Sequence, residues 1–334
     1  MSKDLSPEFQ RIHDEATVVD GHTDVIQGLF GTLDMFGKRK KFRILAEKSK
    51  EGHVDIPRLK EGGVDCQIFA IWSDPMRSYD ATLRCMELLG HLLSEFEKNE
   101  TSIHLATSYP EIMETIAAKK IAALLSLEGG EPINGKAGLL RLFYEMGVRL
   151  LGPTWSYRNQ LAFGNREDPK YGFSEAGFEV IKEAERLGII LDVSHLNEQS
   201  FYDLAGSTSK PFIASHSNAK ALWDHPRNLD DKQIRLLADR GGAIGINFNP
   251  PFLGKEVGVD TVCKQIKYIT NLVGSEHVGL GSDYDGIETT PVGLEDISKL
   301  PAITKKLAED GMSKVDLENV LGQSFLRVFK SVLS

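Results

Sequence analysis

The sequence alternates between short apolar runs of strand length and longer amphipathic segments, and this alternation limits its possible folds more than any other feature. The runs are residues 17–25 (TVVDGHTDV), 64–72 (VDCQIFAIW), 121–130 (IAALLSLEGG), 148–155 (VRLLGPTW), 189–196 (IILDVSHL), 211–218 (PFIASHSN), 241–249 (GGAIGINFN) and 277–285 (HVGLGSDYD). Strands that are apolar on both faces and separated by helices predict a parallel sheet covered by helices. Residues 102–108 are a candidate for a further short strand.

The segments between the runs carry the marks of helices. Four clear ones are 78–99, 175–188, 230–242 and 259–274. In 78–99 the apolar residues recur at the spacing of one helix face. Residues 175–188 and 230–242 end in glycine, a common helix stop. We expect the long stretch 31–63, which is basic in its middle, to form an elaborated loop after the first strand.

Eight strand–helix units in a chain of this length predict an α/β fold of the (β/α)₈ TIM barrel type. We expect residues 1–334 to form one such barrel as a single domain. A doubly wound open sheet is the alternative. Its dinucleotide-binding form is disfavoured, because no GxGxxG motif follows the first run.

Composition excludes several classes of partner. The net charge of −9 argues against nucleic acid, whose binding proteins are usually basic. No apolar run approaches the roughly 18 residues of a membrane span, and the first ten residues lack the apolar core of a signal peptide. The three cysteines, Cys66, Cys85 and Cys263, are too scattered for a disulfide framework or a CxxC metal site. We therefore expect a cytoplasmic protein without nucleic-acid or membrane partners.

Polar residues gather where the predicted strands end, which is where the chemistry of such barrels lies. The strand-end residues are His22, Asp24, Glu128, His195, His216 and Asp283, with Asp285 two positions further on. Residues two apart on a strand point the same way, so His22 and Asp24 are expected to face the barrel mouth together. Since unpaired buried charges cost several kcal/mol each, carboxylates and imidazoles that converge there predict a bound cation.

The residue types suit Zn²⁺, with Mn²⁺, Co²⁺ and Fe²⁺ as alternatives. They are more ligands than one catalytic zinc needs, and a glutamate can bridge two metals through its two oxygens. We expect His22, Asp24 and Glu128 to hold one metal, and Glu128, His195 and His216 to hold the other. The remaining histidines are expected to be structural; they are His13, His53, His91, His104, His225 and His277.

The chain resembles the membrane (renal-type) dipeptidases and their bacterial relatives, in the amidohydrolase superfamily. The resemblance rests on VVDGHTDV, HVDIPRLKEGGV, LLSLEGG, LDVSHLNEQSF, IASHSNAKAL followed by HPRNL, GLGSDYDG followed by GLEDISKLP, and LGQSFLRVFK. These motifs cover nearly the whole chain, in the family's order.

The resemblance implies a (β/α)₈ barrel with two zinc ions bridged by Glu128. The other ligands would be His22, Asp24, His195 and His216. Asp283 matches the family's catalytic aspartate, and Arg227 matches its substrate-binding arginine. Family members cleave dipeptides, tolerate a D-residue at the C-terminal position, and in many cases form homodimers.

The chain departs from the renal-type pattern in two ways. Pro153-Thr154-Trp155 stands where that enzyme has a histidine thought to help hold the tetrahedral intermediate. Trp155 cannot bind a metal, but its indole N–H can donate one hydrogen bond. The secretion signal, lipid-anchor signal and disulfide cysteines of the renal enzyme have no counterpart here, which favours a bacterial-type member without a membrane anchor.

We therefore expect a binuclear zinc dipeptidase that hydrolyses free dipeptides, L-Xaa-D-Xaa included. A metal-bridging hydroxide would attack the peptide carbonyl, with Asp283 as the proton shuttle and Arg227 pairing with the terminal carboxylate. Two alternatives stay open. One is another amidohydrolase activity, namely a deaminase, lactonase or β-lactam hydrolase. The other is a barrel that binds metal or peptide without catalysis.

Overall fold

The computed structural model describes residues 7–30, 43–74 and 80–334. Its strands form one parallel sheet in the order β6-β5-β4-β2-β1-β9-β8-β7, with β3 paired to β4 beside that path. The strands are β1 (Val18–Thr23), β2 (Val64–Trp72), β3 (Ile103–Leu105), β4 (Ile121–Glu128), β5 (Val148–Gly152), β6 (Ile190–Leu191), β7 (Ile213–Ser217), β8 (Ala243–Ile246) and β9 (Val278–Leu280). A parallel bridge between Asp192 and Ile213 joins the β6 and β7 ends of the sheet and closes the ring.

The predicted (β/α)₈ barrel is confirmed. Each of the eight apolar runs contains one barrel strand, and the candidate segment 102–108 contains β3. All of these strands except β2 are shorter than their runs, and β6 spans only Ile190–Leu191. There the chain leaves the ladder at Asp192, whose carboxylate accepts a hydrogen bond from Ser194 N at 3.0 Å. Local side-chain bonds of this kind compete with the strand ladder.

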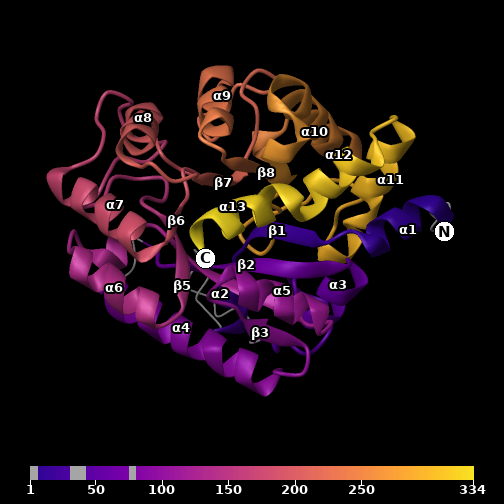
Figure 1. The fold of residues 1–334 in the computed structure, drawn as a ribbon, viewed down its shortest axis with the longest axis horizontal. Coiled ribbons are helices and arrows are strands. Elements are labelled where there is room, and N and C mark those ends of the chain that lie inside the picture. Colours follow the sequence, from indigo (N-terminus) through magenta and orange to yellow (C-terminus); the bar gives the residue numbers. More distant parts are fainter. Residues whose placement is uncertain (1–6, 31–42, 75–79) are drawn as a thin grey trace.

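The helices cover the outside of the ring (Figure 1). They are α1 (Pro7–Glu15), α2 (Val25–Leu29), α3 (Ile56–Glu61), α4 (Ala81–Lys98), α5 (Tyr109–Ala117), α6 (Ala137–Glu145), α7 (Glu175–Leu187), α8 (Glu198–Ser207), α9 (Asp231–Asp239), α10 (Val259–Val273), α11 (Pro301–Glu309), α12 (Lys314–Glu318) and α13 (Ser324–Val332). The four predicted helices are confirmed. Gly188 ends α7 in the left-handed region at φ 74°, and Asp230 opens α9 with a capping box.

The expectation that residues 31–63 form a loop is partly wrong. Residues 31–42 lie outside the described residues, and 43–55 have no regular structure, as expected. The chain then forms α3, because the Asp55 side chain accepts from Arg58 N at 2.9 Å and Pro57 occupies the first turn. A capping carboxylate followed by proline favours a helix start.

The N-terminal end of the barrel is closed by α13, which lies across the middle of the view in Figure 1. Its Phe325 and Phe329 are fully buried and pack with apolar residues of the strands, among them Ile68, Leu124 and Leu150. Burial of this kind stabilises a fold by roughly 25 cal/mol per Å² of apolar surface. One end of the barrel is therefore a dry apolar core.

The cysteines Cys66, Cys85 and Cys263 are free and buried, as expected. Burial raises the pKa of the Cys85 thiol to about 12, so it is a poor nucleophile near neutral pH. Among the described residues, no helix is both long and apolar enough to cross a membrane.

Candidate metal centre

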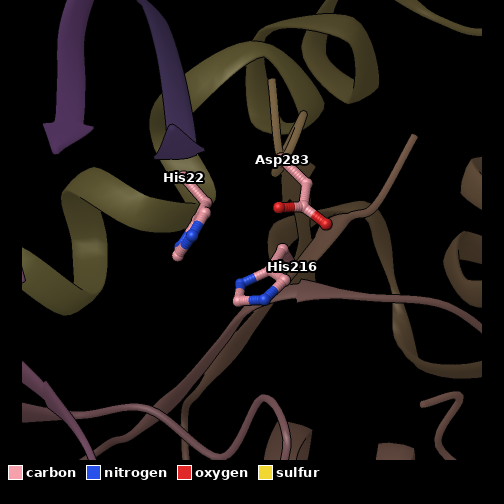
Figure 2. Close-up of side chains that lie close together, drawn as sticks. All are labelled: His22, His216 and Asp283. Carbon is pink, nitrogen blue, oxygen red and sulfur yellow. The ribbon is translucent and has the colours of Figure 1, made fainter. Parts of the chain in front are cut away.

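The six predicted strand-end residues come together at the other end of the barrel. Three of them, His22, His216 and Asp283, are drawn in Figure 2, where their side chains point toward one another from different strand ends. All six are buried, none more than 9% exposed. Within the described residues their ligand atoms form three groups, each spanning no more than 4.8 Å: His22 with Asp24 and Glu128, Glu128 with His195 and His216, and His22 with His216 and Asp283.

Glu128 lies between two of these groups and faces each with a different oxygen. Its Oε2 lies 3.5 Å from His22 Nε2. Its Oε1 lies 2.9 Å from His195 Nε2 and 3.8 Å from His216 Nε2. On the first side, Asp24 Oδ2 lies 3.4 Å from His22 Nε2. One carboxylate thus adjoins two different sets of ligand atoms.

The donor atoms fit a cation better than they fit one another. Both ring nitrogens of His22 are buried without a hydrogen-bond partner among the described residues. The Nε2 atoms of His195 and His216 face each other at 2.9 Å. Buried polar groups are rarely left unpaired, and three imidazoles with carboxylates form a donor set typical of Zn²⁺.

The electrostatics of the cluster lead to the same conclusion. Burial, together with the Asp24 carboxylate, raises the pKa of Glu128 to about 7. Burial raises the pKa of Asp283 to about 6, although His22 opposes this. Burial and the nearby cations hold the pKa values of His195 and His216 well below their usual range, so these imidazoles are neutral, as metal ligands must be. Burial alone would lower the pKa of His22, but Glu128 and Asp24 raise it well above its usual range.

The backbone reaches this arrangement by turns that strand alternation does not predict. β1 ends at Thr23, and Asp24 is the N-cap residue of α2 without a side-chain capping bond. His195 and Asp283 follow their strands at φ 76° and 61°, in the left-handed region. Non-glycine residues seldom adopt it, and such strain gathers at functional sites. The expectation that His22 and Asp24 lie on one continuous strand is therefore wrong, although both side chains reach the cluster.

Asp283 is held by a residue that the sequence did not single out. Asn247, which follows β8, donates from Nδ2 to Asp283 Oδ2 at 2.9 Å. This leaves Oδ1 of Asp283 on the side of Asp24 and Gly286. The sequence signal that could have identified this residue is the polar Asn247 at the end of an apolar run.

Arg227 lies beside the cluster and is 5% exposed. Its Nη2 donates to the His216 carbonyl at 3.3 Å, and its Nε has no partner. Its guanidinium carbon lies 5.5 Å from the ring centre of Phe252. Among the described residues, no carboxylate lies within ion-pair distance of it. The carboxylates of Asp283, Glu128 and Asp192 act on it from beyond that distance. A buried guanidinium without a carboxylate in direct contact is costly, so this position suits an anionic group of a ligand.

Trp155, which follows β5, lies on the His195 side of the cluster. Its ring centre is 6.0 Å from that of His195, 5.2 Å from Trp72 and 5.7 Å from Tyr157. These three aromatic residues form a half-buried wall beside the cluster. Two surface hollows, of about 440 and 510 Å³, lie elsewhere, and none of the predicted site residues lines either of them.

Of the other histidines, His53 contacts Asp285 and His225 contacts Arg227. His53 Nδ1 accepts from Asp285 N at 2.9 Å. His225 Nδ1 accepts from Arg227 N at 3.1 Å, and its ring lies 4.5 Å from that of Phe252. Both imidazoles have protein partners, as a structural role requires.

The sequence profile of the membrane dipeptidases, peptidase family M19, matches residues 7–334. The chain belongs to this family. The resemblance seen in the strand-end motifs is thereby confirmed, and the protein is a hydrolase of the metallo-dipeptidase class.

Relatives in fungi share much of the sequence. The chain is 30% identical over 338 residues to an uncharacterised dipeptidase of Schizosaccharomyces pombe. The match covers 94% of this chain and 80% of that protein. It is 32% identical over 299 residues to the dipeptidase aclJ of Aspergillus oryzae. That match covers 84% of this chain and 70% of the other protein.

Solved structures of metallopeptidases are similar to this chain in fold. A metallopeptidase of Rhodobacter sphaeroides, liganded with a phosphinate mimic of the dipeptide L-Ala-D-Ala, matches with a TM-score of 0.85 at 28% identity. The match covers 95% of this chain and 99% of that one. The M19 dipeptidase AC matches with the same TM-score, identity and coverage.

Proposed function

We propose that this M19 family member is a binuclear zinc dipeptidase of a single domain, and that it accepts L-Xaa-D-Xaa substrates. The observation that carries the proposal is Glu128, whose two oxygens adjoin two different ligand sets. His22 and Asp24 would hold one zinc with Glu128 Oε2, and His195 and His216 the other with Oε1. Zinc bound there supplies Lewis acidity and lowers the pKa of a water molecule.

Arg227 is proposed to bind the terminal carboxylate of the dipeptide. A guanidinium pairs with a carboxylate through two parallel hydrogen bonds, and Arg227 has an unpaired Nε and no carboxylate partner among the described residues. A substrate with a free carboxylate would supply a direct ion-pair partner. A longer peptide would place an uncharged amide at the same point, which favours dipeptides.

Asp283 is proposed to accept a proton during attack on the peptide carbonyl and to return it to the leaving amine. Asn247 fixes one of its oxygens, which orients the carboxylate for proton transfer. Trp155 is proposed to contact the substrate beside His195 and to offer its indole N–H to the developing oxyanion.

The experiment is to load the metal-free protein with zinc and to assay L-Ala-L-Ala, L-Ala-D-Ala and the C-terminally amidated L-Ala-D-Ala. We expect two zinc equivalents per chain by elemental analysis, hydrolysis of both free dipeptides, and little hydrolysis of the amide. Full activity with one equivalent would refute the binuclear site. Hydrolysis of lactones or nucleobase amines in place of dipeptides would favour the other amidohydrolase activities.

Arg227→Met tests the carboxylate subsite, with Arg227→Lys as the charge-conserving comparison. Removing one partner of a buried charge pair costs about 2–5 kcal/mol, so kcat/KM for L-Ala-D-Ala should fall by at least about 30-fold in Arg227→Met. The amidated substrate should change little. An equal loss for both substrates would assign Arg227 a structural role.

Sedimentation of the zinc-loaded protein tests the homodimer that the resemblance predicts.

A further inference from the structure

The strand that carries His216 pairs irregularly with its neighbour β8 where it reaches the metal centre. The register shift falls between Ala214 and Ser217, and the Ser215 carbonyl oxygen lies within this stretch. Gly21, Gly245 and Gly281 surround that oxygen, and a Cβ atom at any of the three would collide with it. An irregularity of this kind re-aims a side chain beside a site, and here three glycines make room for it.

The irregularity brings Ser215 between a carboxylate and the His216 ring. Asp192 Oδ1 accepts from Ser194 N at 3.0 Å and from Ser215 N at 2.9 Å. The Ser215 hydroxyl donates to Asp192 Oδ2. The same hydroxyl oxygen lies 2.7 Å from His216 Nδ1. All of these groups are nearly fully buried.

The direction of these hydrogen bonds follows from a count of protons. Three donors point at Asp192, so it acts as an acceptor-only carboxylate. A serine hydroxyl has one proton, and that proton goes to Asp192. Ser215 Oγ can then only accept from His216, so the ring proton of His216 must be on Nδ1. The Nε2 atom that faces Glu128 therefore carries a bare lone pair.

We propose that Asp192 and Ser215 are positioning residues that fix the tautomer and orientation of His216 as an Nε2 metal ligand. The proposal rests on the proposed zinc site and deepens it. Partners of this kind tune a ligand's affinity for its metal. The other two imidazoles lack an equivalent relay, because His195 Nδ1 reaches only the Ser156 hydroxyl at 3.3 Å and the ring nitrogens of His22 have no hydrogen-bond partner among the described residues.

The first test is zinc affinity, measured by competition with a chromogenic chelator. Ser215→Ala should weaken the zinc site that contains His216 by about 10–100-fold, and Asp192→Asn should weaken it in the same direction. Ser215→Thr, which keeps the hydroxyl, should recover most of the affinity. The matched control is Ser217→Ala, because the Ser217 hydroxyl is also buried next to His216 but has no partner within the described residues.

The second test uses the unmutated metal-free protein and does not depend on zinc. Nitrogen-15 NMR of labelled histidine, at a pH where His216 is neutral, should show its proton on Nδ1. If the protein binds no zinc at all, the proposed function fails while this spectrum still tests the relay. A proton on Nε2, or equal zinc affinity in Ser215→Ala and Ser217→Ala, would overturn the proposal.

Discussion

The two ends of this barrel are built from the same strands but have opposite chemistry. At the N-terminal end, α13 inserts Phe325 and Phe329 into an apolar interior. At the C-terminal end, six buried polar residues converge, and burial raises the pKa values of Glu128 and Asp283. The first end contributes free energy of folding, whereas the second costs free energy until a cation balances its charge. Stability and function are therefore separated along the barrel axis.

The largest effect is expected from Glu128→Gln, which keeps the shape of the side chain and removes its charge. Loss of the shared ligand should lower kcat/KM by about 10⁴-fold, or about 5 kcal/mol of transition-state stabilisation, while circular dichroism stays unchanged. Glu131→Gln is the matched control, three residues along the chain, and should retain activity. If both variants kept full activity, Glu128 would not be a metal ligand.

The opposite end should respond in stability and not in catalysis. Phe325→Ala removes a fully buried ring and should lower the free energy of unfolding by about 3–5 kcal/mol in denaturant titrations. Zinc affinity and KM of the folded variant should match those of the parent protein. Val315→Ala, at a position 65% exposed, should change stability by less than about 0.5 kcal/mol. A loss of zinc in Phe325→Ala would show that the two ends are coupled.

Removal of metal should show which end of the barrel depends on zinc for its stability. At a free zinc concentration of 100 times Kd, each site should add about 2.7 kcal/mol to the free energy of unfolding. A chelator should abolish this increment. Phe325→Ala should retain the increment, and Glu128→Gln should lose most of it. Equal increments in both variants, measured by thermal unfolding, would contradict the separation.

The smallest effect concerns a titratable group far from the metal centre. His13 of α1 contacts Thr304 Oγ1 at 2.7 Å and the Gly62 carbonyl at 3.0 Å, and burial lowers its pKa below the usual 6.5. The unfolded chain therefore binds the proton more tightly, and His13 should destabilise the fold as the pH falls below about 6.5. The stability difference between the parent protein and His13→Gln should shrink between pH 7 and pH 5. A difference independent of pH would show that His13 does not titrate in this way.

Much of this molecule could be predicted from its sequence. Apolar runs of strand length between amphipathic helices predict a parallel barrel, because both faces of each strand must be buried. The positions of His22, Glu128, His195 and His216 at the ends of those runs placed them at one end of the barrel. The helix α3 was missed because its capping signals, Asp55 and Pro57, lie inside a stretch dominated by charged residues.

The sequence by itself determined which residue types stand at each strand end and which family the motifs resemble. Only the tertiary structure decided how they meet. Asp192 lies beside Ser215 because β6 and β7 close the ring, and Asn247 lies beside Asp283 because β8 pairs with β9. Local periodicity contains no signal for either pairing, because hydrogen-bond partners depend on ring closure, a register shift and left-handed turns.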